Sequence, residues 1–99
     1  MNSFEQFEPR MSWSVAEKKA ARRAFDQALE RNLAAIMAET KRTMALVREP
    51  SDLWKVEAYL TESRKAVDRV YRFRYSHLLT MFSILMRDGW LTEEDLVGL

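Results

Sequence analysis

The sequence has no cysteine, and its 99 residues include only two glycines, two prolines and one histidine. Without cysteine there can be no disulfides and no thiolate metal sites. So few glycines and prolines do not suit an all-β fold with its many turns, and they leave no glycine-rich loop to hold a phosphate. His77 has no second histidine or cysteine at ligand spacing, and no nucleophile–base pair stands out. We therefore expect no metal, no cofactor and no enzymatic activity.

The chain also lacks an excess of charge and a long apolar run. Its 16 basic and 15 acidic residues give a formal net charge of +1. The basic cluster within residues 64–74 is interrupted by Asp68 and offset by Glu57 and Glu62, so we expect no nucleic-acid partner. The apolar runs are much shorter than the ~20 residues of a membrane span, and the first ten residues do not resemble a secretory signal. The sequence therefore predicts a cytoplasmic protein with no membrane span.

Two long helices account for most of the chain. Ser14 and Glu17 fit a capping box, with Trp13 placed as a hydrophobic staple, and the helix that follows can run to Arg48 before Glu49-Pro50 stops it. Its apolar positions follow a repeat of about 11 residues, as in a nearly straight helix: Phe25, Leu29, Leu33, Ile36, Met44 and Val47. Residues 1–13 are expected to be a flexible N-terminus, with a strap that docks Phe4 or Phe7 on the rest as the alternative.

The second long stretch, residues 51–87, contains no glycine or proline, and Ser51 or Asp52 is expected to cap it. Its apolar positions are spaced three and four residues apart, as on one side of a helix: Leu53, Val56, Leu60, Val67, Tyr71, Leu78, Phe82 and Leu85. Residues 71–75 alternate with period two and residues 78–86 are apolar nearly all round, so a bend is expected within 73–76. Leu78, Phe82 and Leu85 would then form the core of a small head. Gly89 is expected to end its helix, and Thr92 with Asp95 to cap a last short helix through Leu96.

The length of the first helix bears on assembly. About 34 helical residues extend ~50 Å, whereas a compact chain of this size has a radius of gyration of only ~13 Å. Folding the second helix back along the first makes an antiparallel hairpin whose outer apolar stripe stays exposed unless a second copy covers it. We therefore predict a single all-α domain over residues 1–99, with a long hairpin stalk (14–72) and a small helical head (73–99), assembled as a homodimer.

A strip of mixed side chains lies up to about 130° away from the apolar centre of the second helix: Trp54, Glu57, Thr61, Arg64, Lys65 and Asp68. A tryptophan so far from the core is either covered by another chain or offered to a partner, and both readings stay open. The spacing of Arg64, Asp68 and Arg72 also fits an ordinary solvated charge ladder.

Several of these residues resemble the fluorescence recovery protein family of cyanobacteria. The resemblance covers residues 13–96 and rests on Trp13-Ser14, Asp52-Leu53-Trp54-Lys55, Leu60, Arg64, Asp68, Tyr71 and Gly89. It implies an all-helical homodimer that binds the orange carotenoid protein and speeds its return from the red to the orange form, which ends quenching of the phycobilisome. It also implies that Leu53 lies at the dimer seam and that Trp54 and Arg64 belong to the functional patch.

The sequence departs from the family pattern at a few positions. Glu57 and Ala58 stand where the family has a His-Asp pair, Thr80 stands where an aromatic residue is expected, and the chain ends at Leu99, before the family's basic tail. These departures leave open a related helical dimer that has a different protein partner. We expect partner contacts from Trp54, Glu57, Arg64 and Asp68, and a dimer interface formed by Leu33, Ile36, Leu53, Trp54 and Leu60.

Overall fold

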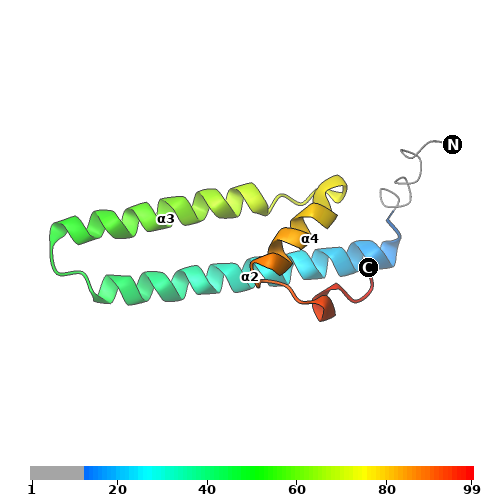
Figure 1. Ribbon diagram of the computed structural model, residues 1–99, viewed down its shortest axis with the longest axis horizontal. Coiled ribbons are helices and arrows are strands. Elements are labelled where there is room, and N and C mark those ends of the chain that lie inside the picture. Colours follow the sequence, from blue (N-terminus) through cyan, green and yellow to red (C-terminus); the bar gives the residue numbers. More distant parts are fainter. Residues whose placement is uncertain (1–12) are drawn as a thin grey trace. The chain divides into compact units, whose positions relative to one another are not determined.

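The computed structural model describes residues 13–99, and all their regular structure is helical (Figure 1). The described part has three α-helices, α2 (Val15–Ala45), α3 (Pro50–Val70) and α4 (Leu78–Arg87). A short 3-10 helix, η2 (Tyr75–His77), precedes α4, and a second, η3 (Glu93–Leu96), follows it. The predicted all-α fold class is therefore confirmed. The expectations for Phe4 and Phe7 concern residues outside the described part.

Helix α2 begins as the sequence predicts and ends earlier. The Ser14 N–H donates to Glu17 Oε1 at 2.9 Å and the Glu17 N–H to Ser14 Oγ at 3.0 Å, so the capping box is formed. The prediction that this helix runs to Arg48 was wrong, because it ends at Ala45. Beyond it, two backbone N–H groups donate hydrogen bonds to carbonyls three residues earlier: Leu46 to Thr43 and Val47 to Met44.

Helix α3 starts at Pro50, whose missing N–H costs nothing at a first helical position. The N-cap is Glu49, so the expectation that Ser51 or Asp52 caps this helix was wrong. Asp52 instead occupies the third helical position, and its Oδ2 accepts N–H bonds from Arg48 at 3.0 Å and Glu49 at 3.1 Å. These two bonds hold the connecting loop against the start of α3.

The chain leaves α3 without the help of glycine or proline. Tyr71 has φ −91° and ψ 63°, and the Arg72 N–H bonds back to the Val70 carbonyl at 3.1 Å, which together make an inverse γ-turn. The predicted break in the second helical stretch is confirmed, but it begins at Tyr71, slightly before the expected bend. Phe73 follows, and its ring packs edge-on against Phe25 with centroids 5.0 Å apart.

By its internal contacts the chain divides into two compact units. The head unit contains residues 13–28 and Phe73–Leu99, and the hairpin unit contains Leu29–Arg72. The predicted boundary between stalk and head remains a prediction, because α2 runs through both units.

The head unit has a core of small and large apolar side chains. The predicted burial of Leu78, Phe82 and Leu85 is confirmed, and the full set of buried residues is Ala20, Ala21, Ala24, Phe25, Ala28, Leu78, Met81, Phe82, Leu85 and Leu91. Gly89, with φ +85°, ends α4 as predicted. The predicted cap of the last helix is also confirmed, because Thr92 and Asp95 form a capping box.

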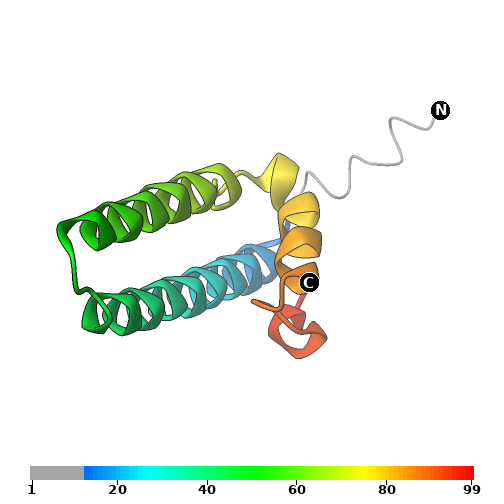
Figure 2. The ribbon, with the colours of Figure 1, turned by 60° about the vertical axis from the view of Figure 1, so that its left-hand side comes forward.

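In the hairpin unit, the second half of α2 and α3 run antiparallel, side by side, in both Figure 1 and Figure 2. The Asn32 amide bonds the Tyr71 hydroxyl at 3.1 Å, between residues 39 apart in the sequence. Between the helices the side chains are mostly half-buried, with Val56 the most buried. Such a two-helix unit buries little apolar surface by itself, so apolar side chains of both helices remain exposed.

Candidate functional site

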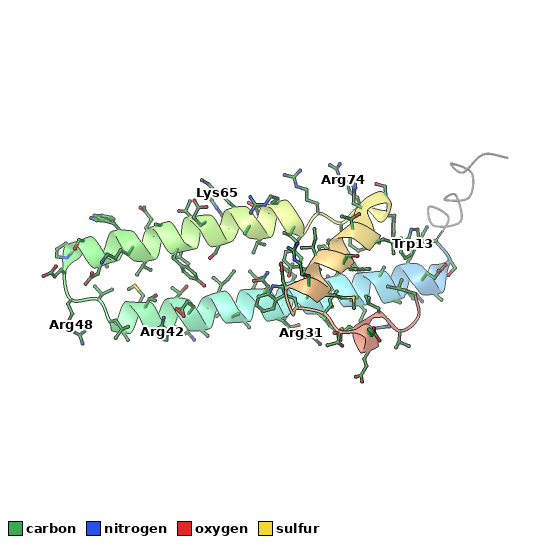
Figure 3. All side chains as sticks on the ribbon, in the orientation of Figure 1. Trp13, Arg31, Arg42, Arg48, Lys65 and Arg74 are labelled. Atoms are coloured by element: carbon green, nitrogen blue, oxygen red, sulfur yellow. The ribbon has the colours of Figure 1, made fainter. Side chains whose placement is uncertain are left out.

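Trp54 is the most exposed aromatic side chain of the described residues, with 63% of its surface accessible. It lies one turn into α3, the helix that starts at Pro50 and whose first turn is held to the loop by Asp52. Lys65 projects from the side of α3 that faces away from α2 in Figure 3. Trp54 lies 11 residues before Lys65, which places it within about 20° of the same side of the helix. The tryptophan therefore points out from the hairpin and packs on nothing in its own core.

The strip residues Glu57, Arg64 and Asp68 are all exposed. Other charged residues of the hairpin unit pair within the chain: Arg42 with Glu39, Lys55 with Asp52 and Lys65 with Glu62. Across residues 13–99, the side chains of Glu57, Arg64 and Asp68 form no such ion pair, although the Asp68 carbonyl accepts a bond from Arg72 Nε at 3.1 Å. Their charges are thus available to another molecule.

An uncovered apolar surface borders this strip. Leu33, Met37 and Met44 of α2 lie within about 40° of one another around that helix, and Leu53 and Leu60 of α3 within about 20°. All five are more than two-fifths exposed. On each helix, the group lies about 70–110° around the axis from the side that packs against the other helix. The rotation has the same direction on both helices, so in an antiparallel pair both groups lie on the same side of the hairpin. We call these five residues the apolar side of the hairpin.

The residues expected at a dimer interface fall on two parts of this surface. Leu33, Leu53 and Leu60 belong to the apolar side, and Trp54 lies on the outer strip, whereas Ile36 is only half-exposed. Met37 also belongs to this surface but was not among the predicted interface residues, although its position four residues after Leu33 places it on the same side of α2.

A pocket of about 190 Å³ lies at the loop end of the hairpin unit. It is lined mostly by apolar side chains, with one acidic and one basic residue at its edge: Thr43, Leu46, Val47, Asp52, Lys55, Val56 and Tyr59. The N–H bonds from Arg48 and then Glu49 hold the pKa of Asp52 below its usual 3.8, and nearby Lys55 contributes less. Asp52 is therefore a fixed negative charge that closes the loop.

Two family departures can also be placed. Glu57 and Ala58, where the family resemblance implies a His-Asp pair, are both exposed on α3, and Glu57 belongs to the strip. Thr80 is exposed on α4 in the head unit.

No group of histidine, aspartate and glutamate side chains within residues 13–99 could hold a metal ion. None of the helices in that range has the length and apolarity needed to cross a membrane.

Comparison with known proteins supports the family resemblance. A family model described as "Photoprotection regulator fluorescence recovery protein" matches residues 13–99. The fluorescence recovery protein of Synechocystis sp. is 30% identical over 87 residues, which are 88% of this chain and 80% of that protein. Among solved structures, the Fremyella diplosiphon fluorescence recovery protein superimposes with a TM-score of 0.84 at 32% identity, and the Synechocystis one with 0.83 at 30%. Both alignments cover 88% of this chain and 85% of the other. The chain belongs to the fluorescence recovery protein family of photoprotection regulators.

Proposed function

We propose that this chain binds the orange carotenoid protein and accelerates its reversion from the red to the orange form, so ending phycobilisome quenching. The observation that carries the proposal is the outer strip of α3. Exposed Trp54 lies there with three charges that have no ion-pair partner across residues 13–99, those of Glu57, Arg64 and Asp68. Tryptophan and arginine are among the residue types most enriched in interface hot spots. A cytoplasmic location is part of this proposal.

The proposed mechanism is differential binding and needs no catalytic side chain. A partner with two conformations shifts toward the one that is bound better. The two conformations interconvert faster only when the transition state between them is bound more tightly than either conformation. Charged groups fixed on a rigid helix suit this role, because they keep their geometry while the partner changes shape.

We also propose that two copies associate through the apolar side of the hairpin. Five exposed apolar residues on one side, drawn from both helices, form a surface that isolated soluble chains rarely leave open. A twofold axis would bring this surface against itself, with Glu57, Arg64 and Asp68 at the rim. The strip would then flank the seam, open to a partner.

A helical dimer with a different protein partner is the second candidate. It is favoured by Glu57 and Ala58, because these exposed positions place the negative charge one residue earlier than the His-Asp pair that the family resemblance implies. The deciding experiment mixes the purified protein with photoactivated orange carotenoid protein and follows the red-to-orange decay by absorbance. A faster decay at substoichiometric protein supports the first candidate. An unchanged decay, together with no co-elution in gel filtration, assigns the strip to another partner.

A further inference from the structure

Two methionines lie on the apolar side of the hairpin with their side chains open to solvent. Met37 is 58% exposed and Met44 is 48% exposed, and both belong to α2. They are seven residues apart, so they fall within about 20° of one another around the helix and about 10 Å apart along it. Met81, by contrast, is 5% exposed in the core of the head unit. The same chain thus has two methionine side chains exposed to solvent and one that is buried.

We propose that Met37 and Met44 are an oxidation site through which hydroperoxides weaken association of the hairpin. The thioether sulfur attacks one peroxide oxygen, the O–O bond breaks, and a sulfoxide and one molecule of water are formed when the oxidant is hydrogen peroxide. The sulfur loses two electrons and the peroxide gains them, so no further reactant is needed. The reaction turns a flexible apolar side chain into a polar one.

The consequence for association follows from where the two sulfurs lie. They share a surface with Leu33, Leu53 and Leu60, where nearly all contacts across a seam would be apolar. A sulfoxide oxygen buried there has no donor in reach, and burying a polar group without a hydrogen bond is unfavourable. Every dimer would carry each sulfoxide twice because the interface is symmetric. This inference rests on the homodimer proposed above.

The same geometry predicts how the reaction depends on assembly. In a dimer the apolar side is covered, so peroxide reaches Met37 and Met44 mainly in dissociated chains. Oxidation at these positions should therefore slow as protein concentration rises, while Met81 should react slowly at every concentration. Once formed, the sulfoxides hold the chain in the dissociated state until a sulfoxide reductase removes the oxygen.

The experiment compares the full-length protein before and after hydrogen peroxide, with peptide mass spectrometry to locate each sulfoxide and sedimentation velocity to measure association. We expect Met37 and Met44 to oxidise well before Met81, and the dimer dissociation constant to rise at least about tenfold, the equivalent of ~1.4 kcal/mol. Methionine sulfoxide reductases should restore the original value. The variant with Met37→Leu and Met44→Leu keeps the volume and apolarity of both sites. It should remain dimeric and insensitive to peroxide, although every other methionine is present.

Met37→Gln with Met44→Gln places a polar group at both sites without peroxide, and it should weaken association while the far-ultraviolet circular dichroism stays helical. The inference is overturned if both sulfoxides form and association is unchanged. It is also overturned if Met37 and Met44 react no faster than Met81, or if the leucine variant responds to peroxide as the wild type does. If the untreated protein is already monomeric, the proposed homodimer and this inference fall together, and that result is seen before any peroxide is added.

Discussion

The side-chain amide of Asn32 donates a hydrogen bond to the hydroxyl of Tyr71 at 3.1 Å, joining the second half of α2 to the first residue beyond α3. The Tyr71 N–H still bonds to Val67, so this residue closes the last turn of α3 while its side chain reaches the other helix. The bond fixes the register of the hairpin at the end opposite the loop. It also lies where the chain turns out of α3.

Tyr71→Phe removes this hydroxyl and leaves the part-buried Asn32 amide without that acceptor. We expect the free energy of unfolding to fall by about 0.5–1.5 kcal/mol, measured by urea titration. Tyr75→Phe is the matched control, since no hydrogen bond of the Tyr75 hydroxyl is seen across residues 13–99. Equal losses in the two variants would show that the Asn32 bond is not what stabilises the hairpin.

Local signals in the sequence were sufficient where one short motif decides the structure. The capping box of Ser14 and Glu17 and the positive-φ end at Gly89 each depend on a few neighbouring residues, and they formed as expected. The end of α3 does not depend on a local motif. Phe73 is held by Phe25 and by the Arg22 guanidinium, whose Cζ lies 4.8 Å from its ring centroid. Periodicity in α3 cannot report contacts made with a segment about 50 residues away.

The core of the head can be tested at Phe82, which is almost fully buried. Phe82→Ala leaves a cavity among Leu78, Leu85 and their neighbours, and should lower the free energy of unfolding by ~3–5 kcal/mol. A thermal melt followed by circular dichroism measures the loss. A variant that melts with the wild type would contradict the packing of this unit.

Asp52 predicts a pH dependence of stability. The N–H bonds from Arg48 and Glu49 lower the pKa of Asp52 in the folded chain, so the unfolded chain takes up a proton more readily. The stabilisation is fully present above the unfolded pKa of 3.8 and is lost as pH falls through the lowered folded pKa. Asp52→Asn should therefore flatten the loss of stability below about pH 4, measured by thermal melts from pH 2.5 to 6. Parallel curves for variant and wild type would show that this carboxylate does not contribute.

The candidate site was only partly readable from the sequence. The placement of Trp54 and Arg64 away from the core follows from helical spacing alone. Which charges stay free follows only in part. Glu62 lies three residues before Lys65, a spacing that predicts an ion pair, and the pair forms with Oε1 and Nζ 3.6 Å apart. Arg64 and Asp68 have the equally suitable i, i+4 spacing but form no ion pair across residues 13–99, which only the three-dimensional arrangement shows.

Leu53→Glu tests the proposed homodimer. Leu53 lies on the apolar side of the hairpin and is 42% exposed, so a charge is tolerated in a single chain but not in a covered seam. We expect sedimentation velocity to show a helical monomer at micromolar concentration. Leu79→Glu is the matched control, because Leu79 is 43% exposed on α4 and lies in the head unit. A wild-type protein that already sediments as a monomer would refute the dimer.

Trp54→Ala and Arg64→Ala test the outer strip as the partner-binding surface. The two residues are ten positions apart, so they lie about 15 Å from each other along the axis of α3 and about 80° apart around it, both within the strip. Both side chains project from the hairpin core, and truncation should leave the helical fold intact. Removing an interface hot spot costs ~2 kcal/mol or more, so each variant should bind the orange carotenoid protein at least about 30-fold more weakly.

Arg69→Ala is the control that separates position from charge. Arg69 is an exposed arginine of the same helix that lies just outside the strip, about 140° around the axis from Arg64 and about 40° beyond Lys65. We expect its loss to leave binding and the rate of red-to-orange reversion nearly unchanged. Arg64→Lys keeps the charge but loses the planar, two-pronged geometry that suits a carboxylate, so it should weaken binding almost as much as Arg64→Ala. If Arg69→Ala and Arg64→Ala weaken binding equally, the strip acts only through net charge. The partner would then be recognised elsewhere on the molecule.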